Sequence, residues 1–406
     1  MKTIARKLIP ALTWRRRSLV SSRRLSFLFI ICYLLFPPVP AVSASRLDSL
    51  EIGLLTCSPH EELYSLYGHT ALRVHDLHSG QDMVFNYGMF RPESDLFIWH
   101  FTMGHTDYEL GVAPTEAFLD YYRRWGSRVT EQVLSLTDVE KVSIFNALRV
   151  NYMPQNRVYR YNVFFDNCAT RPRDIIVANL SGTVGYEPRP GFEPSLREMV
   201  RDCTAGHAWA TFGNDMLLGL QADRPTTQRE QQFLPVCLSY DFDRATVSRQ
   251  GRRQPLVAAR RELVPPGVQT VEPGFPLSPL ACSLLLLALC LAVLAYEQAR
   301  HTVARWLDLL LMLLSGLAGC ILFLMLFSEH PTTGSNLQVL LLNPLPLFFL
   351  WPVMKGRGRP FFRLQTALVA LFLLGGFWQS YAEGMYVVAL CLLSRACRHL
   401  VGRQIG

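Results

Sequence analysis

The chain contains 406 residues, of which 50% are hydrophobic, and it carries a formal net charge of +8 from 40 Lys and Arg against 32 Asp and Glu. Eight of the basic residues lie in residues 1–44, which contain no acidic residue, so the rest of the chain is formally neutral. The positive charge therefore belongs to the N-terminal segment, and it gives no reason to expect a nucleic-acid partner.

Residues 1–44 are predicted to be an export signal peptide. Their basic part precedes the apolar run Leu25–Phe36, and Val42-Ser43-Ala44 has the small residues of a cleavage site. The apolar run ends too early for a comfortable membrane span, so we favour cleavage after Ala44. An uncleaved anchor is the alternative.

The C-terminal part, residues 280–406, is predicted to be an all-α bundle of about five transmembrane helices. Four apolar stretches are close to the ~20 residues that a helix needs to cross the hydrocarbon core, and a fifth is shorter. These stretches are Leu280–Tyr296, Leu309–Phe327, Leu337–Met354, Phe361–Trp378 and Met385–Leu393.

The loops between these stretches predict their orientation in a membrane. The loops after the first, third and fifth stretches contain Arg or Lys, whereas Ser328–Asn336 and Ser380–Gly384 contain neither. Because cytoplasmic loops are enriched in basic residues, this alternation predicts an exported N-terminal domain and a cytoplasmic C-terminus.

Residues 45–263 are long enough for one sizeable core, and residues 264–279 form a Pro- and Gly-rich tether. Runs of β-branched and aromatic residues, separated by Gly, Asp and Ser, predict an α+β fold. The predicted strands are Leu50–Thr56, Thr70–His75, Met83–Tyr87 and Arg128–Leu136. The predicted helices are Pro114–Trp125 and a second one that opens with the capping box Thr137-Asp138-Val139-Glu140 and runs to about Asn151.

Two motifs about a hundred residues apart indicate a nucleophile and a base. His69 stands at the start of a predicted strand, and Cys168 stands where polar residues open the helical run Ile175–Leu180. The positive end of a helix dipole favours the thiolate form of a cysteine, and an imidazole beside it would complete a Cys/His pair. Pro172 requires that helix to begin near Thr170. A buried structural cysteine and a core histidine are the alternative interpretation.

The exported region contains Cys57, Cys168, Cys203 and Cys237. An oxidising compartment permits disulfides, and Cys203–Cys237 is the first pair we expect. Two disulfides and no nucleophile are the alternative. Since no pair has the C-x-x-C spacing and the histidines are scattered, we expect neither a metal site nor a cofactor.

Further motifs carry a resemblance to a known family. In chain order they are Cys57–Pro59, Tyr64–Ala71, Phe85–Gly88, Asn151–Arg157, Tyr159–Asn162, Asp166–Arg171 and Ala222–Arg224. They resemble the DUF4105 family, the periplasmic domain of the Lnb-type lipoprotein N-acyltransferases of Gram-negative bacteria. Two membrane-loop motifs, Ser328–Pro331 and Asn343–Leu345, also resemble this family. Pro172 departs from the family pattern, in which an aliphatic residue is expected.

The resemblance implies a permuted papain-like domain of the lecithin–retinol acyltransferase kind. There a histidine opens a strand, a polar residue lies on the next strand, and the cysteine comes last, on a helix. By this resemblance the catalytic residues are His69, Asn86 and Cys168. Cys168 would attack a phospholipid ester and hold the acyl group as a thioester. His69 would act as the base and Asn86 would orient its imidazole.

Three further residues are predicted to contact the substrates. Tyr67 would face a developing oxyanion, and Arg171 would meet a lipid phosphate. His330, in the exported loop Ser328–Asn336, would contact a head group or the acceptor. Packing, a surface ion pair and an ordinary loop position are the respective alternatives.

The leading hypothesis is a thiol acyltransferase of the bacterial inner membrane with a periplasmic catalytic domain. It would move an acyl chain from a phospholipid to the α-amine of a diacylglyceryl-cysteine lipoprotein. One alternative is a papain-like hydrolase of peptidoglycan peptides or phospholipids, in which water resolves the acyl-enzyme. The other is a non-enzymatic envelope module for assembly or reception.

Overall fold

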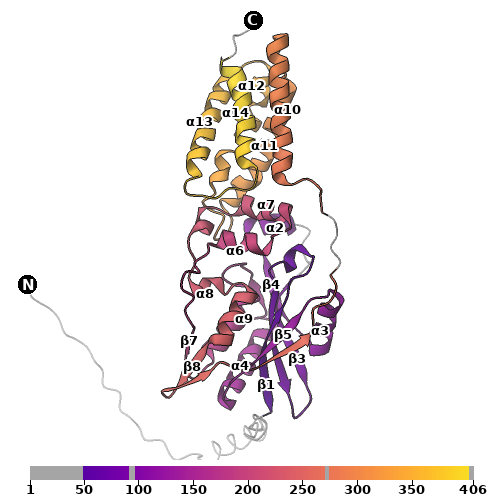
Figure 1. Cartoon of the computed structure of the whole chain (residues 1–406), viewed down its shortest axis with the longest axis vertical. Coiled ribbons are helices and arrows are strands. Elements are labelled where there is room, and N and C mark those ends of the chain that lie inside the picture. The colour runs from indigo at the N-terminus through magenta and orange to yellow at the C-terminus, as the bar shows by residue number, and fades with distance from the viewer. Residues whose placement is uncertain (1–48, 91–96, 270–273, 402–406) are drawn as a thin grey trace, which may run out of the picture. The chain divides into compact units, whose positions relative to one another are not determined.

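The computed structural model describes residues 49–90, 97–269 and 274–401, and the predicted signal peptide lies outside these ranges. Residues 49–264 form an α+β unit that we call the N-terminal domain, and residues 279–401 form a unit of helices that we call the helical domain (Figure 1). The α+β prediction is confirmed for the first unit and the all-α prediction for the second.

The N-terminal domain is built around a seven-stranded antiparallel sheet in the order β10-β5-β1-β2-β3-β4-β6. Its strands are β1 Leu50–Cys57, β2 His69–Asp76, β3 Asp82–Phe90, β4 Asp107–Pro114, β5 Val129–Leu134, β6 Val158–Arg160 and β10 Val257–Val264. A smaller sheet contains β7 Thr183–Gly185, β8 Thr246–Arg249 and β9 Arg252–Pro255. The four predicted strands correspond to β1, β2, β3 and β5.

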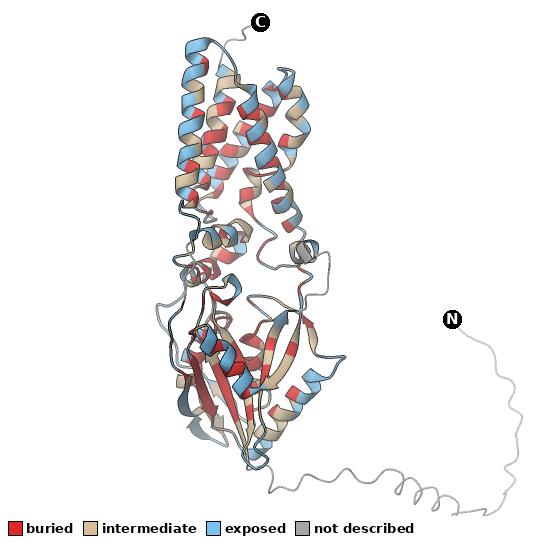
Figure 2. Cartoon of the chain, turned by 90° about the vertical axis from the view of Figure 1, so that its right-hand side faces the viewer, coloured by how far each residue is buried: buried red, intermediate tan, exposed pale blue. Residues whose placement is uncertain are grey.

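Helices cover both faces of the large sheet because neighbouring side chains of a strand point to opposite faces. Leu54 of β1 packs in a cluster with helices α4, α5 and α9, whereas Leu55 packs in another with α3. Figure 2 shows the central strands buried between these layers. The helices are α3 Thr115–Arg124, α4 Asp138–Tyr152, α5 Thr170–Ala178 and α9 Pro235–Arg244. The capping box predicted for α4 is present.

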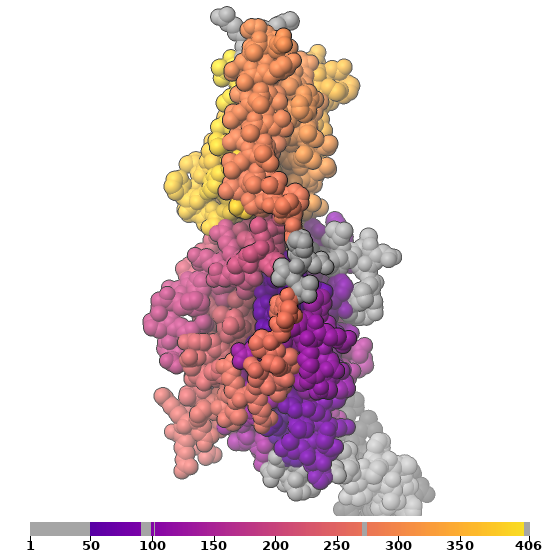
Figure 3. Space-filling view, turned by 45° about the vertical axis from the view of Figure 1, so that its right-hand side comes forward, coloured from indigo at the N-terminus to yellow at the C-terminus, as the bar shows by residue number. Residues whose placement is uncertain are grey.

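Shorter helices complete the N-terminal domain. They are η2 Leu63–Ser65, α2 Phe97–Met103, α6 Leu196–Cys203, α7 Ala208–Leu217, η3 Leu220–Asp223 and α8 Gln228–Gln231. After β10 the chain runs back over the turn that follows α3 (Figure 3). There the Gly267 N–H donates to the Gly126 carbonyl oxygen (3.0 Å), and Gln269 Nε2 donates to that of Pro59 (2.9 Å). The described part of the predicted tether therefore lies against the N-terminal domain.

The expected Cys203–Cys237 disulfide is wrong, because both residues are free thiols. They belong to one apolar cluster with Phe164 and Phe233. Burial raises the pKa of the Cys203 thiol to about 12. Both cysteines therefore act as small apolar side chains of the core.

The helical domain contains α10 Pro279–Arg300, α11 Arg305–Met325, η4 Leu337–Leu340, α12 Leu345–Met354, α13 Arg359–Gly375 and α14 Met385–Val401. Three segments of the described chain are long and apolar enough to cross a membrane: Pro279–Arg300, Arg305–Met325 and Leu337–Met354. The third is interrupted between η4 and α12. Helices α13 and α14 have 17 residues each, which is slightly less than the ~20 of a full span.

A buried group of charged side chains joins three helices of this domain. Arg395 of α14 donates to both carboxylate oxygens of Glu297 on α10 (2.7 and 3.0 Å) and to Asp308 on α11 (2.7 Å). A ring nitrogen of His399 lies 2.7 Å from the second oxygen of Asp308. Since the first three residues are at most 2% exposed, each charge is compensated inside the protein.

The loops at the other end of these helices contact the N-terminal domain. The Gly219 N–H donates to the Thr332 carbonyl oxygen (2.7 Å) and the Leu220 N–H to that of Ser335 (2.9 Å). Arg201 donates to the Tyr381 carbonyl oxygen (3.2 Å). The loops that contain these residues are the two without Lys or Arg, Ser328–Asn336 and Ser380–Gly384.

Candidate active site

Cys168 lies in the turn immediately before α5, and the side chain of Asn167 fixes this turn. The Asn167 Oδ1 accepts hydrogen bonds from the N–H groups of Ala169 (2.8 Å) and Thr170 (2.9 Å). Its Nδ2 donates to two backbone carbonyl oxygens, at 2.7 and 2.9 Å. Asn167 therefore satisfies the first N–H groups of α5 and holds Cys168 at the positive end of the helix. It is not among the predicted site residues, although Asn just before a helix is a common capping residue.

His69 is the first residue of β2, and the turn before it is constrained. Gly68 has a φ of +72°, and a Cβ at this position would lie 2.9 Å from the Cys57 carbonyl oxygen. A side chain would be strained there by its backbone conformation and by this contact, so the turn requires glycine. Cys57 and His69 are direct neighbours across β1 and β2. The turn thus fixes where the histidine enters the sheet.

The imidazole of His69 contacts both Asn86 and Cys168. Its Nε2 lies 2.5 Å from Asn86 Oδ1 on β3, and the ring also forms a hydrogen bond with the Cys168 side chain. With Nε2 occupied by the amide oxygen, Nδ1 is the nitrogen left for the sulfur. Gly88, with a φ of +90°, lies beside the cysteine, since a Cβ there would stand 3.6 Å from the Cys168 Cβ. The structure therefore brings the three predicted catalytic residues together.

The electrostatics of the pair favour a thiolate beside an imidazolium. Burial acts to raise the pKa of the Cys168 thiol, but the charge and hydrogen bond of His69 and the N–H groups of Thr70 and Cys168 outweigh it, so this pKa is lowered. Burial acts to lower the pKa of His69, but the charge of Cys168 and the hydrogen bonds with Cys168 and Asn86 raise it. A lowered thiol pKa is what a cysteine nucleophile needs.

Aromatic and apolar side chains surround the thiol. The ring of Tyr161 stacks on that of Tyr108 with 4.4 Å between centroids. Burial, together with the charge of Cys168, raises the pKa of Tyr161 well above its ordinary value, so its phenol stays neutral. The exposed apolar side chains on the segments next to Gly88 and Cys168 are Met89, Phe90, Val163 and Phe165. The surroundings of the site therefore suit an apolar substrate better than a charged one.

Tyr67 lies two residues before His69, and its hydroxyl accepts a hydrogen bond from another residue. Asn214 Nδ2 of α7 donates to the Tyr67 hydroxyl oxygen (2.9 Å). Burial raises the pKa of Tyr67 to about 12. A bond to α7 therefore orients the Tyr67 hydroxyl.

Arg171 follows Cys168 by three residues and is held by other side chains. Its Nε and Nη2 donate to the two carboxylate oxygens of Asp166 (2.6 and 2.7 Å). Its guanidinium lies over the ring of Tyr159, 3.6 Å from the centroid. Arg171 thereby stiffens the two ends of the cysteine turn.

His330 lies in the loop after α11, where the helical domain meets α2. The neighbouring Glu329 donates its N–H to the Met103 carbonyl oxygen (3.0 Å) and forms ion pairs with Arg160 and with His105. His330 is therefore placed at the boundary between the two domains, in the loop predicted to be exported. Among the described residues, no group of three or more His, Cys, Asp or Glu side chains could hold a metal ion.

Two family models match parts of the chain. Residues 41–187 match the Lnb N-terminal periplasmic domain, and residues 270–404 match the Lnb transmembrane domain. The chain belongs to the Lnb-type family. No curated protein and no solved structure matches it significantly.

This Lnb-type protein is thus an inner-membrane protein with a periplasmic domain. The periplasmic match contains His69, Asn86 and Cys168, and the transmembrane match contains His330. Residues 188–269, which include helix α7, lie between the two matches.

Proposed function

We propose that this Lnb-type protein is a membrane-anchored thiol acyltransferase. It would move an acyl chain from a phospholipid, through a thioester on Cys168, to the α-amine of a diacylglyceryl-cysteine lipoprotein. The observation that carries the proposal is the hydrogen-bonded arrangement of the buried Cys168 with the partly buried His69 and Asn86, within an Lnb periplasmic domain. We further propose that this domain has the permuted papain-like fold, since its histidine, amide and cysteine follow the expected order on a strand, the next strand and the turn before a helix.

In the first half-reaction the Cys168 thiolate attacks the ester carbonyl carbon of the phospholipid. The carbon–oxygen bond of the ester breaks, a thioester forms, and the leaving alkoxide takes the proton of the His69 imidazolium. The N–H groups of Thr70 and Cys168 hydrogen-bond the sulfur, so they stabilise the negative charge of the thiolate before it attacks. Asn86 keeps the imidazole ring in one orientation during the proton transfer.

In the second half-reaction the lipoprotein amine attacks the thioester. The new amide bond forms as the carbon–sulfur bond breaks, His69 takes a proton from the amine, and the Cys168 thiolate is regenerated beside the imidazolium. The exclusion of water decides between transfer and hydrolysis, because water could resolve the same thioester. Exposed apolar side chains such as Phe90 and Phe165 near the thiol favour acyl chains at this site.

We propose five membrane passes, with residues 45–263 in the periplasm, the tether 264–279, and the C-terminus in the cytoplasm. Two observations support this topology. The loops Ser328–Asn336 and Ser380–Gly384, which contain no Lys or Arg, form hydrogen bonds with the N-terminal domain. The loops that contain Lys or Arg lie at the opposite ends of the helices. Helices α13 and α14 reach span length with a few flanking residues. Signal cleavage after Ala44 belongs to the same proposal.

The test is the N-terminal acylation state of membrane lipoproteins, measured by mass spectrometry of their N-terminal peptides. Cells that lack the gene should accumulate the diacyl form with a free amine, and the wild-type gene should restore the N-acylated form. Cys168→Ser should fail to restore it, whereas the matched variant Cys203→Ser, which changes a core thiol, should succeed. Equal restoration by Cys168→Ser would exclude the thioester mechanism.

A further inference from the structure

Helix α7 contacts the helical domain through apolar and polar side chains. Phe212 and Met216 pack against the hydrophobic cluster of that domain. The Trp209 Nε1 donates to the Leu277 carbonyl oxygen just before α10 (2.8 Å). Helix α7 of the N-terminal domain therefore packs directly against the helical domain.

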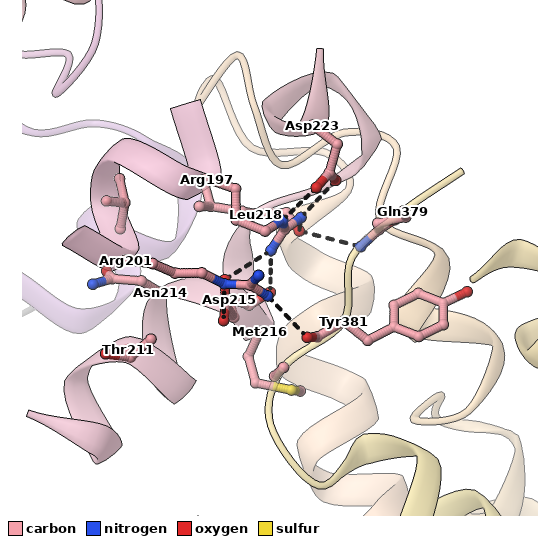
Figure 4. Close-up of polar contacts among 12 residues, drawn as sticks. Arg197, Arg201, Thr211, Asn214, Asp215, Met216, Leu218, Asp223, Gln379 and Tyr381 are labelled. Carbon is pink, nitrogen blue, oxygen red and sulfur yellow. Dashed lines mark hydrogen bonds and ion pairs between the residues drawn. The ribbon is translucent and has the colours of Figure 1, made fainter. Parts of the chain in front are cut away.

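Side chains of the helical domain also cap the end of α7. Three side-chain amides donate to backbone carbonyl oxygens at this end. Gln338 donates to Asp215 (2.8 Å) and Asn336 to Met216 (2.7 Å), both in α7. Gln379 donates to Leu218 (3.3 Å), the residue just after α7. The last carbonyl groups of a helix have no partner within the helix. The helical domain thus supplies partners for these carbonyl groups, and Figure 4 shows the Gln379 bond from this set. Arg197 also donates to the carbonyl oxygens of Asp215 and Leu218.

The same helix end is fixed from the periplasmic side. Asp215 is 2% exposed, and its carboxylate accepts from Arg197 (3.1 Å) and Arg201 (2.9 Å). Arg197, which is 1% exposed, also bonds Asp223 (2.8 Å), as Figure 4 shows. Separating the buried charges of Asp215 and Arg197 from their partners is costly, so these ion pairs fix α7 to the N-terminal domain.

The residue before Asp215 links this rigid helix to the catalytic turn. Asn214 donates to the hydroxyl of Tyr67, which stands 147 positions earlier in the chain. Tyr67 precedes Gly68 and His69, and the Gly68 N–H donates to the Ser65 carbonyl oxygen (2.8 Å), so a hydrogen bond holds the turn between them. The direction in which His69 enters β2 therefore depends on where α7 holds Tyr67.

We propose that Asn214 and Gln338 are positioning residues. Through them, the docking of the N-terminal domain on the helical domain sets the orientation of His69. Gln338 fixes α7 to the helical domain, Asn214 transmits that position to Tyr67, and the Tyr67–His69 turn sets the imidazole against Cys168. The inference rests on the proposed function in that it takes Cys168 and His69 as the reacting pair. It adds that this pair is set correctly only while the periplasmic domain is docked on the membrane part.

The experiment uses the full-length protein in lipid nanodiscs and measures how fast iodoacetamide alkylates Cys168 as a function of pH, by peptide mass spectrometry. Each lost hydrogen bond to the positioning chain should slow alkylation at pH 7 about fivefold and move the profile to higher pH. We expect this for Asn214→Ala and Gln338→Ala. The matched controls Asn179→Ala and Gln365→Ala should keep the wild-type profile, because these amides lie outside the chain from Gln338 to Tyr67.

Tyr67→Phe and its double variant with Asn214→Ala test the link itself. If Asn214 acts through the Tyr67 hydroxyl, the double variant should be no slower than either single variant. Tyr67→Phe keeps the ring packed, so it decides the question if Asn214→Ala fails to fold. Wild-type profiles in Tyr67→Phe and Gln338→Ala, or additive effects in the double variant, would overturn the inference. The readout does not involve acyl transfer, so absence of lipoprotein acylation would refute the proposed function separately.

Discussion

Replacing Asn86 with alanine would remove the group that holds the imidazolium of His69. Burial acts to lower the pKa of His69, and the charge of Cys168 and two hydrogen bonds, one of them to Asn86, raise it. The bond to be lost is 2.5 Å long and lies inside the domain. A hydrogen bond to a charged group contributes about 1.5–3 kcal/mol. The thiolate–imidazolium form should therefore become about 10- to 150-fold less favoured relative to the neutral pair.

The pH dependence follows from the directions of the two shifts. The lowered pKa of Cys168 and the raised pKa of His69 both favour the thiolate–imidazolium pair over the neutral pair. Asn86→Ala should raise the pKa of Cys168 and lower the pKa of His69. Both changes narrow the pH range in which the thiolate–imidazolium pair forms. Alkylation of Cys168 at pH 7 should slow by the same factor of about 10–150 and recover at alkaline pH, where the thiol ionises without its partner.

Peptide mass spectrometry of iodoacetamide-treated protein, sampled from pH 5 to 10, would measure this profile. Asn179→Ala is the control, since it removes an equally part-buried amide at the far end of α5 and should leave the profile unchanged. A wild-type profile for Asn86→Ala would show that the amide does not support the charged histidine, and the third catalytic position would then have to be sought elsewhere.

Three further outcomes are expected. Cys168→Ala should abolish lipoprotein N-acylation yet keep the melting temperature within a few degrees, because a small side chain at a helix start leaves little cavity; persisting acylation would place the nucleophile elsewhere. Gly68→Ala should cost at least ~1–3 kcal/mol in thermal or urea unfolding, and more than Gly80→Ala, which has a similar φ but open space around it; equal costs would refute the predicted clash with the Cys57 carbonyl. The separate domain 45–263 should lose most transfer to a micellar lipopeptide, because each CH₂ drawn out of the membrane costs ~0.8 kcal/mol; full activity would reduce the spans to an anchor.

The sequence predicted that His69 and Cys168 would meet, because local rules place both residues. The cysteine stands before a predicted helix and the histidine at the start of a predicted strand, and the two side chains do meet in the structure. The strands β1, β2, β3 and β5 were equally predictable from their apolar runs. Asn167 also followed a local rule, that of helix capping, and could have been predicted from its place before α5.

The remaining features depend on contacts that no local pattern encodes. Gln338 and Asp215 are 123 positions apart, and single amide side chains carry no periodic signal that would pair them. For Arg171 the sequence did not predict the bonds from Nε and Nη2 to Asp166, and its contact with a lipid phosphate stays a prediction. The two core cysteines were expected as a disulfide because composition and compartment say nothing about how side chains pack.

Because Glu297, Asp308 and Arg395 are buried together, the order in which their helices are synthesised affects how the helical domain assembles. Glu297 on α10 and Asp308 on α11 leave the ribosome about ninety residues before the arginine that compensates them both. Until α14 packs, the two carboxylates lack this partner, and an uncompensated buried charge is unfavourable. A chain that ends before α14 should therefore fail to assemble and should be degraded rapidly in a pulse-chase experiment. Packing of α14 is therefore the step that completes the helical domain.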